Sequence, residues 1–344
     1  MMLRIMADDM TGALDVAAPF ATLDRPVRLV LDNAGRSAEK LTFSTESRDL
    51  SEAAAMALVV AAHVRLRVQG HESPIWFKKV DSVLRGHPLA ETLALARAGN
   101  FVHCLFAPAF PQMGRVTVDG CQLFKTPSGK WKPTRHGDLR QAFAALVPLH
   151  APGLDLVVID AETDEGLRLA VQPWLDKSGV LWAGSRGLAQ ALAPPFAPLV
   201  PGPAGLIVIG TNHPVTRVQA GQVSARTRSV PDEDEFEPVA AHPLLVDPVP
   251  MCNTSAQTRV ALNAVLKRMT SPRDGSAIIV IGGDTLTILL RSVDACALDC
   301  LGEIGPGLPL SRIEGGRMAG TMLISKSGGF GGPYLLRDLV WPRP

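Results

Sequence analysis

The sequence predicts an α/β protein with two domains, each built on a mostly parallel sheet flanked by helices. Short apolar runs alternate with longer alanine-rich stretches of helical character along the 344 residues, an order typical of α/β layers. The apolar runs are continuous in Val, Ile and Leu, as in strands that helices cover on both faces. The segment 193–205 contains five prolines in thirteen residues, and proline cannot donate a hydrogen bond to a sheet. We therefore interpret this segment as a linker between domains at residues 1–198 and 203–344.

The expected elements follow in chain order. Strands of the first domain are expected at 3–7, 27–32, 75–80, 102–107 and 156–160, with a helix over 51–68. Strands of the second domain are expected at 206–209, 277–281 and 322–325, with a helix over 255–269. One further strand of the first domain is expected to end at the segment 45–48.

Charge and cysteine content exclude several classes of protein. The net charge is +1, from 34 Lys and Arg against 33 Asp and Glu, which gives no long-range field to attract nucleic acid or an anionic membrane. The five cysteines lack the paired spacing of a zinc site, and a reduced, cytoplasmic setting fits them best. No apolar run reaches about 18 residues, so neither a membrane span nor a signal peptide is expected.

Charged residues gather just after the strands of the first domain. Asp8 and Asp9 follow the first strand, Arg48 follows another, and segment 78–85 brings two lysines, an aspartate, a serine and an arginine after a third. Ligands of open α/β sheets bind outside the carboxyl ends of the strands, so these side chains are expected to converge on one crevice. Helix capping is the competing interpretation for the two aspartates, which would otherwise bind a polyol or hold Mg²⁺ through water.

Glycines follow the strands of the second domain. The segments 209–213 (IGTNH) and 281–285 (IGGDT) each run from a strand through glycine into an expected helix, and 326–333 (KSGGFGGP) has four glycines in eight residues. Backbone N–H groups can approach a phosphate closely at such turns, where the helix N-terminus favours negative charge. None is a Walker motif or a GxGxxG fingerprint, so plain tight turns and a flexible tail are the competing interpretations.

Taken in order, these segments resemble the four-carbon acid sugar kinase family. The matching strings are ADDMTGALD, TESR, KKVDSVLRG, APAFPQMGRVTVDG, LWAGSRGLA, IGTNHPVT, GGDTL, EIGPGLPL and KSGGFGGP. They run from Met6 to Pro333, and the DSVLRG, APAFPQMGR and KSGGFG strings together are highly specific. The resemblance implies an N-terminal domain that binds the acid sugar, a C-terminal domain that binds ATP, and an active site in the interdomain cleft.

The resemblance also implies which residues serve each ligand. Those expected to contact the acid sugar are Asp8, Asp9, Arg48, Lys79, Val80, Asp81, Ser82 and Arg85. Those expected to contact ATP are Thr211, His213, Gly282, Gly283, Asp284, Thr285 and Gly328. Arg115 is expected near the same cleft, and no side chain is assigned as a direct metal ligand.

Phosphoryl transfer depends mostly on positioning and charge neutralisation, which suggests roles for these residues. Arg48 and Lys79 would hold the sugar carboxylate, and Asp9 would order its hydroxyls. Asp81 would take the proton of the attacking hydroxyl, with Asp284 as the other candidate for the base or for a ligand of metal-bound water. ATP and Mg²⁺ are the expected cofactors, and the product would be phosphorylated at the terminal hydroxyl of threonate, erythronate or 3-oxo-tetronate.

Other functions remain open from the sequence. His213 stands where the family usually carries a small hydroxyl residue, and the second half is shorter than in typical members. The alternative is therefore a non-catalytic acid-sugar sensor with a degenerate nucleotide domain. A Rossmann dehydrogenase is poorly supported, because ADDMTG stands where a glycine-rich fingerprint would be needed. The sequence also leaves open which four-carbon acid is used and whether the protein forms a homodimer.

Overall fold

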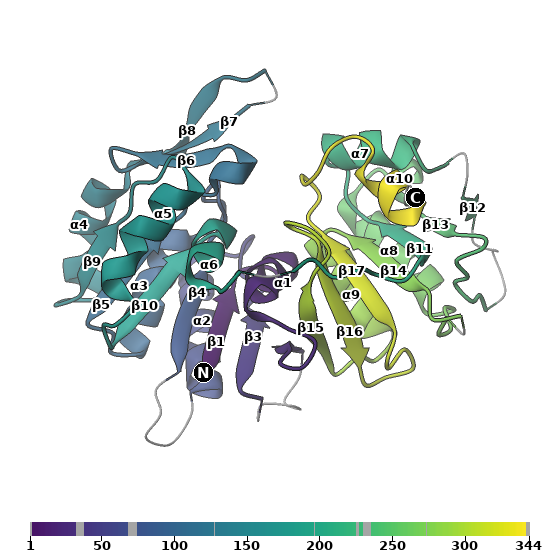
Figure 1. Ribbon diagram of the computed structural model, residues 1–344, viewed down its shortest axis with the longest axis horizontal. Helices are drawn as coiled ribbons and strands as arrows, with labels where there is room; N and C mark the ends of the chain where they lie inside the picture. The colour runs from purple at the N-terminus through teal and green to yellow at the C-terminus, as the bar shows by residue number, and fades with distance from the viewer. Residues whose placement is uncertain are drawn as a thin grey trace. The chain divides into compact units, whose positions relative to one another are not determined.

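The computed structural model describes residues 2–31, 38–67, 74–126, 128–195, 197–224, 227–229, 235–272 and 274–341. The chain forms two compact units (Figure 1). The first comprises Met1–Phe20 and Arg36–Phe196, and the second comprises Ala21–Gly35 and Ala197–Pro344. Helices flank a parallel sheet in the first unit and a mixed sheet in the second, so the predicted α/β class is confirmed.

The first unit is built on a parallel sheet with strand order β3-β1-β4-β10-β5-β9. These strands are β1 (Leu3–Ala7), β3 (Lys40–Ser44), β4 (Ile75–Lys79), β5 (His103–Ala107), β9 (Asp155–Val158) and β10 (Val180–Gly184). The helices are α1 (Met10–Ala17), α2 (Glu52–Leu66), α3 (Pro88–Ala98), α4 (Leu139–His150), α5 (Asp164–Val171) and α6 (Arg186–Leu192). Short 3-10 helices are η1 (Ala18–Phe20), η2 (Pro111–Met113) and η3 (Gln172–Trp174). Every residue of β1 and β10 is buried, as the continuous apolar runs predict for strands covered on both faces.

The register of this sheet determines where the segments after its strands begin. Ala7 at the end of β1 pairs with Ser44 at the end of β3, and Met6 of β1 pairs with Lys78 near the end of β4. The chain therefore leaves three neighbouring strands at the same edge of the sheet. The last residues of the predicted strand at 27–32 and of the predicted helix at 51–68 lie outside the described residues.

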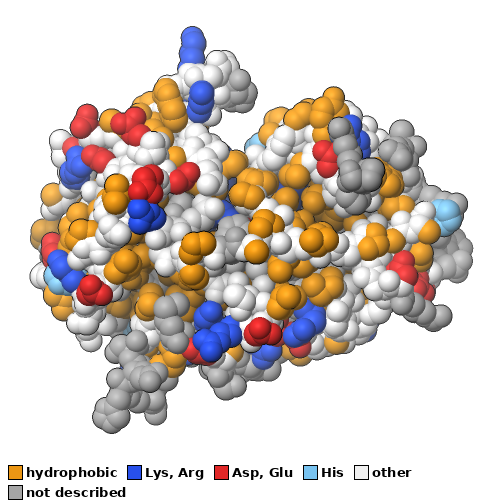
Figure 2. All heavy atoms as spheres, viewed as in Figure 1, with side chains coloured by type: hydrophobic (Ala, Val, Ile, Leu, Met, Phe, Trp, Pro, Cys, Tyr) orange, Lys and Arg blue, Asp and Glu red, His pale blue; other side chains and the backbone are white. Residues whose placement is uncertain are grey.

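A small antiparallel sheet is inserted between β5 and α4. Its strands are β6 (Arg115–Val118), β7 (Cys121–Lys125) and β8 (Trp131–Asp138), in the order β6-β7-β8. These strands are not among those expected from the sequence, because their partly exposed segments lack continuous apolar runs. Figure 2 shows Lys and Arg side chains on its projecting end, where Lys125, Lys130 and Lys132 are exposed.

The second unit has a mixed sheet with strand order β12-β13-β11-β14-β17-β16-β15-β2. Pairs from β12 to β17 are parallel, and pairs from β17 to β2 are antiparallel. The strands are β2 (Val27–Val30), β11 (Ala204–Ile209), β12 (Arg228–Ser229), β13 (Leu244–Val246), β14 (Ala277–Ile281), β15 (Ala297–Glu303), β16 (Pro309–Glu314) and β17 (Met322–Lys326). The helices are α7 (Pro214–Gly221), α8 (Ser255–Leu266), α9 (Gly283–Ser292) and α10 (Leu335–Val340), with the 3-10 helix η5 (Val249–Met251).

The strand β2 joins this sheet although the sequence analysis placed it in the first domain. It pairs antiparallel with β15, and the Nε and Nη2 atoms of Arg28 donate to the two carboxylate oxygens of Asp299 at 2.7 and 2.8 Å. The two residues are 271 positions apart in the chain. The residue pattern around 27–32 does not predict this pairing.

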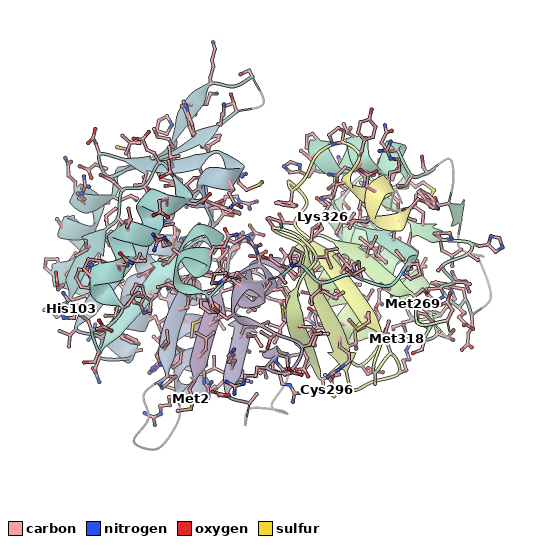
Figure 3. All side chains as sticks on the ribbon, in the orientation of Figure 1. Met2, His103, Met269, Cys296, Met318 and Lys326 are labelled. Atoms are coloured by element: carbon pink, nitrogen blue, oxygen red, sulfur yellow. The ribbon has the colours of Figure 1, made fainter. Side chains whose placement is uncertain are left out.

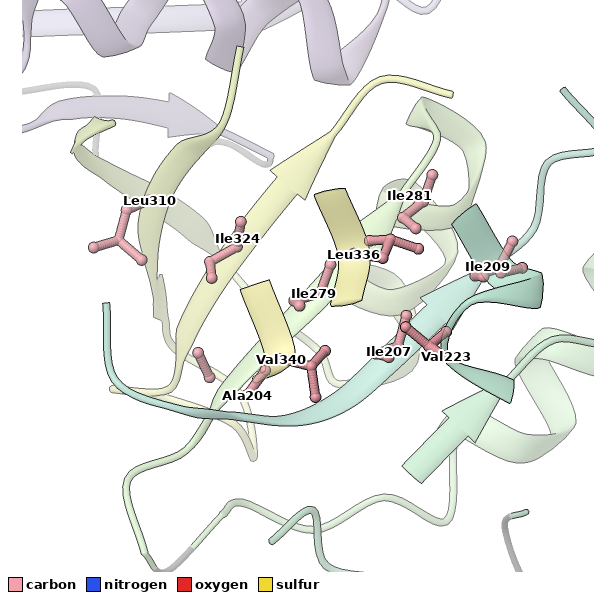
Figure 4. Packing of buried hydrophobic residues seen from close by; sticks show 12 residues of the cluster. Ala204, Ile207, Ile209, Val223, Ile279, Ile281, Leu310, Ile324, Leu336 and Val340 are labelled. Carbon is pink, nitrogen blue, oxygen red and sulfur yellow. The ribbon is translucent and has the colours of Figure 1, made fainter. Parts of the chain in front are cut away.

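The core of the second unit lies where α7 and α10 cover the centre of the sheet (Figure 4). Its buried members are Ala204, Ile207, Ile209, Ala220, Val223, Ala277, Ile279, Ile281, Leu310, Ile324, Leu336 and Val340. Alternate residues of β14 belong to this cluster, as do Ile207 and Ile209 of β11, which is the period expected of one face of a sheet. Within the described ranges, no helix is both long and apolar enough to cross a membrane.

Candidate functional site

Asp8 and Asp9 lie at the turn from β1 into α1. Asp9 is the N-cap residue of α1, and its Oδ1 accepts a hydrogen bond from the Gly12 N–H at 3.2 Å. Its Oδ2 accepts one from the Thr11 hydroxyl at 2.7 Å. Capping thus accounts for Asp9, whereas Asp8, which is 4% exposed, is a buried carboxylate that needs a cation.

Arg48 supplies that cation. Its Nε and Nη2 donate to the two carboxylate oxygens of Asp8 at 2.7 and 2.9 Å, a bidentate pair. Nη2 also donates to Asp9 Oδ1 at 2.6 Å. Burial alone would raise the pKa of Asp8, but the charge and hydrogen bonds of Arg48 outweigh it and hold this pKa below its ordinary value. The three residues form one interlocked group of two acids and one base.

The loop after β4 closes around the carboxylate of Asp81. Oδ2 accepts hydrogen bonds from the N–H groups of Val83 at 3.1 Å and Arg85 at 3.2 Å, and Oδ1 accepts one from Arg85 Nη2 at 2.6 Å. Burial opposes ionisation of Asp81, yet the hydrogen bond and charge of Arg85 hold its pKa well below the usual range. Asp81 is therefore an ionised acceptor at neutral pH.

Lys79 completes this group. The residue is 5% exposed, and its Nζ lies 3.0 Å from the position that a Cβ on Gly12 would take, beside the first turn of α1. The charge of Lys79 acts on both Asp8 and Asp81. We call the set the charge cluster: its members are Asp8, Asp9, Arg48, Lys79, Asp81 and Arg85, three acids and three bases.

Arg115, at the start of β6, adds a further cation. Its Nη1 donates to the Met113 carbonyl at 2.7 Å. Burial lowers the pKa of Arg115, and the charges of Asp81 and Arg85 also act on it, which places it within electrostatic range of the charge cluster. With Arg115 included, the group carries one excess positive charge, which an anionic ligand would neutralise.

A buried network that the sequence analysis did not single out lies beneath Arg48. The Lys78 ammonium is 2.7 Å from Glu91 Oε2, and both side chains are 1% exposed. The Ser47 hydroxyl donates to Glu91 Oε1 at 2.6 Å and lies 2.7 Å from the Thr45 hydroxyl, which donates to the Ala7 carbonyl at 3.0 Å. The network joins the segments that carry Arg48 and Asp8.

Side chains of the inserted sheet hold the loop that carries Asp81. Gln122 Nε2 donates to the Ser82 carbonyl at 2.7 Å, the His136 ring lies 3.2 Å from the Leu84 carbonyl, and Arg135 Nη2 donates to the Gly86 carbonyl. Alternate carbonyls of the loop are thus bound by β7 and β8. Nothing in the local sequence identifies these partners, which lie 40 to 52 positions away.

The segments after three strands of the second unit also meet at one place. Thr211 and His213 follow β11, Gly282 follows β14, and residues 327–332, the glycine loop, follow β17. Gly282 is the N-cap of α9 and has a φ of 102°, a conformation that favours glycine. A Cβ there would lie 3.2 Å from Thr285 Oγ1 and 3.6 Å from Thr211 Cβ.

The glycine loop packs tightly on this group. A Cβ on Gly328 would lie 3.1 Å from Thr211 Oγ1, and one on Gly329 would lie 3.1 Å from His213 Nε2. His213 is the N-cap of α7, and its Nδ1 accepts a hydrogen bond from the Val215 N–H at 3.2 Å. That bond assigns the ring proton of neutral His213 to Nε2, the nitrogen beside the glycine loop.

Lys326, at the end of β17, contacts the glycine loop through its side chain, which no sequence pattern predicts. It is completely buried, and its Nζ donates to the carbonyls of Ser327 and Phe330, both at 2.9 Å. Figure 3 labels Lys326 where β17 enters the glycine loop. Burial lowers the pKa of Lys326 to about 7.

The remaining expected residues occupy different environments. Val80 is 1% exposed and its N–H donates to the Gly184 carbonyl at 2.9 Å, so only its backbone carbonyl is left for a ligand. Gly283 opens α9, and Asp284 is exposed in its first turn. In the part of the chain that the structure describes, no group of three or more His, Cys, Asp or Glu is arranged to hold a metal ion.

The known proteins similar to this chain include several that are named as kinases of four-carbon acids. A family model described as a sugar-binding N-terminal domain matches residues 3–142. A D-threonate kinase of Cupriavidus necator is 30% identical over 89% of this chain and 89% of that protein. A D-threonate kinase of Bordetella bronchiseptica is 27% identical over 95% and 94%. A 3-oxo-tetronate kinase of Burkholderia multivorans is 33% identical over 35% of this chain and 29% of that protein.

Two solved structures share the fold across nearly the whole chain. A Salmonella typhimurium protein described as a proposed tRNA synthase has a TM-score of 0.69 at 18% identity, covering 98% of both chains. A Haemophilus influenzae protein of the DUF1537 family has a TM-score of 0.62 at 16% identity, covering 97% of this chain and 98% of that one. At this identity the likeness supports the architecture and nothing about chemistry.

Proposed function

This chain belongs to the four-carbon acid sugar kinase family and is a carbohydrate kinase, and we propose that it transfers the terminal phosphoryl group of ATP to the terminal hydroxyl of a four-carbon acid sugar. The observation that carries the proposal is the charge cluster at the carboxyl ends of β1, β3 and β4. That edge is where open α/β sheets bind ligands. Ionised acids there suit hydroxyl groups, and an excess cation suits a carboxylate.

We take D-threonate as the first substrate to test. Three relatives that cover most of this chain are named D-threonate kinase. Nε and Nη2 of Arg48 carry its contacts to the two aspartates, so Nη1 is the part of this guanidinium proposed to meet the sugar carboxylate. Lys79 and Arg115 would share that carboxylate, while Asp9 would accept hydrogen bonds from the hydroxyls.

Asp81 is proposed to receive the proton of the attacking hydroxyl. Its lowered pKa keeps it ionised, and the loop holds its two oxygens by three hydrogen bonds. A strongly acidic carboxylate is a weak base, but phosphoryl transfer passes through a loose transition state in which the hydroxyl is deprotonated late. Orientation of the hydroxyl toward the phosphorus is therefore the main contribution proposed for Asp81.

The glycine loop and the turn at Gly282 are proposed to receive the phosphates of ATP, because glycines after a strand let backbone N–H groups approach a phosphate closely. The loop packs tightly there, since a Cβ on Gly328 or Gly329 would lie 3.1 Å from Thr211 or His213. ATP supplies the transferred phosphoryl group, and Mg²⁺ would be held largely by phosphate oxygens and water. Asp284, exposed in the first turn of α9, is the carboxylate proposed to reach a water of that ion. His213 would donate through Nε2 to the same phosphates. The expectation that transfer takes place between the domains stays a prediction.

A coupled ADP-release assay over threonate, erythronate, their 3-oxo forms and glycerate tests this function. We expect ADP release with one four-carbon acid well above the rate with ATP alone. Asp81→Asn should reduce kcat/KM by at least about 100-fold, the size typical of losing a positioned acid–base group. Asp155→Asn, in an exposed pair with His103, is the matched control and should retain full activity. Full turnover by Asp81→Asn would show that Asp81 does not orient or deprotonate the attacking hydroxyl.

Calorimetry separates the kinase from the sensor. A sensor with a degenerate nucleotide domain would bind the acid but show no heat with millimolar ATP, with or without Mg²⁺. A kinase binds both ligands. Absence of ADP release with every acid, together with absence of ATP binding, would overturn the proposed function.

A further inference from the structure

Four carbonyl groups of the glycine loop accept hydrogen bonds from buried side chains: those of Ser327, Gly328, Phe330 and Gly332. Thr216 of α7 donates from Oγ1 to the Gly328 carbonyl at 2.6 Å. Gln219 of α7 donates from Nε2 to the Phe330 carbonyl at 3.0 Å and to the Gly332 carbonyl at 2.8 Å. The Lys326 ammonium donates to the carbonyls of Ser327 and Phe330. These hydrogen bonds to its carbonyl oxygens hold the loop against α7 and the end of β17.

The direction of the carbonyls determines the direction of the amide groups. A trans peptide unit is planar, so its C=O and N–H point to opposite sides, and the described residues contain no cis peptide bond. Because the carbonyls of Ser327, Gly328 and Phe330 point to the buried side, the N–H groups of the residues that follow them point away from it. Those residues are Gly328, Gly329 and Gly331.

Within the described part of the chain, these three N–H groups are available to a ligand. Among the described residues, none of the three is seen to donate a hydrogen bond, and all three glycines are half-buried, hence within reach of a ligand. Successive outward N–H groups form a concavity that binds anions. A Cβ on Gly328 or Gly329 would lie only 3.1 Å from Thr211 or His213, so the loop backbone packs closely on these two residues.

We propose that Thr216, Gln219 and Lys326 are positioning residues that turn the glycine loop so that the amides of Gly328, Gly329 and Gly331 receive phosphate oxygens of ATP. The inference rests on the proposed kinase function and extends it to residues that do not touch the nucleotide. Thr216, Gln219 and Lys326 are each completely buried, and a buried donor is costly unless its acceptor is in place. The loop and its three supports therefore form one unit.

The charge of Lys326 also favours phosphate binding at the glycine loop. In the part of the chain that is described, its ammonium has the two loop carbonyls as hydrogen-bond acceptors, and burial lowers its pKa to about 7. Phosphate oxygens on the outer side of the loop would favour the protonated form. Nucleotide binding near pH 7.5 should then be accompanied by proton uptake, which a Lys326→Met variant should lose.

The test compares Thr216→Val with Thr258→Val. Both threonines are buried and both hydroxyls donate to a backbone carbonyl, but the acceptor of Thr258 is Thr254, the N-cap residue of its own helix α8. Thr216→Val should weaken ATP binding about tenfold, the effect of one lost hydrogen bond near 1.4 kcal/mol, and should raise KM for ATP more than it lowers kcat. Thr216→Ser should restore binding, and Thr258→Val should leave it unchanged.

A second measurement reads the amide groups directly. In wild-type protein labelled with ¹⁵N-glycine, ATP should shift the signals of Gly328, Gly329 and Gly331, and inorganic tripolyphosphate should shift the same signals. In Thr216→Val these shifts should shrink at equal nucleotide concentration. Gln219→Leu provides an independent variant if Thr216→Val does not fold.

The outcomes distinguish this inference from the function on which it rests. If wild-type protein shows no ATP binding, the proposed function and the inference both fall. If wild-type protein binds ATP and Thr216→Val and Gln219→Leu bind it equally well, the inference is wrong while the kinase function stands. If ATP binds but the three glycine signals do not move, the phosphates lie elsewhere and the inference is overturned.

Discussion

Removing one charge from the buried Lys78–Glu91 pair should destabilise the first unit strongly. Glu91→Gln keeps the size and shape of the side chain but removes the carboxylate that pairs directly with the buried Lys78 ammonium. Both side chains are 1% exposed, with 2.7 Å between Nζ and Oε2. Breaking such a pair from one side costs about 3–5 kcal/mol, because desolvation of the remaining charge is no longer offset.

The expected loss is large enough to measure by heat or urea. For a unit of this size, about 3–5 kcal/mol corresponds to a fall in Tm of roughly 6–20 °C. Urea unfolding should give a lower midpoint with an unchanged slope. The matched control is Glu165→Gln, which removes an exposed pair with Arg168 on α5 and should leave the transition unchanged.

A double variant separates the effect of charge burial from that of packing. Lys78→Met with Glu91→Leu replaces both charges by apolar groups of similar volume, so most of the stability should return. Its activity should nevertheless stay low, because Ser47 loses the Glu91 acceptor that fixes the segment before Arg48. A Glu91→Gln protein within about 1 kcal/mol of wild type would refute the reasoning, since the pair would then contribute no more than a surface pair.

Three further predictions concern titration and reactivity. Asp8→Asn should lower the stability at pH 7 by about 2 kcal/mol through loss of a charged hydrogen-bonded pair. The folded-state pKa of Asp8 lies below its unfolded value, so this contribution is present above about pH 4 and disappears as the pH falls through the folded-state pKa. Urea unfolding from pH 7 to 2 should therefore show the free energies of unfolding of the wild type and Asp8→Asn converging. Burial lowers the folded-state pKa of Lys326 to about 7, so the unfolded chain binds more protons between pH 7 and about 10. Wild-type stability should therefore rise over that range relative to Lys326→Met, and parallel pH curves would contradict it. Burial also raises the pKa of the Cys104 thiol, so a thiol reagent should modify Cys104 only on unfolding but the half-buried Cys296 sooner; equal rates in the native protein would argue against this.

Local sequence predicted the strands well because their signal is local. The runs at 3–7 and 277–281 become β1 and β14 with the same bounds, since continuous apolar residues suit a strand buried on both faces. The inserted sheet was not predicted because its strands are partly exposed and lack continuous apolar runs. The pairing of β2 with β15 was not predicted, because the residue pattern of one strand does not indicate which distant strand it pairs with.

The convergence of Asp8, Asp9, Arg48, Lys79 and Asp81 followed from the sequence through one physical rule. Parallel strands carry the residues after their carboxyl ends to the same edge, so placing the residues on strands was enough to bring them together. What they do there stays a proposal. The same rule brought Thr211, Gly282 and the glycine loop to one place in the second unit.

Only the tertiary structure decided how each of these groups is held. The partner of Lys78 is Glu91 on α3, the partners of the Asp81 loop lie on β7 and β8, and the acceptors of Gln219 lie 111 and 113 positions away. Such contacts depend on distance and angle between elements, and no residue pattern within one element encodes them. The sequence by itself therefore determined the α/β class, the family and the edge of the sheet that bears the acids. The tertiary structure determined which charges pair, which carbonyls are bound and hence which amides face outward.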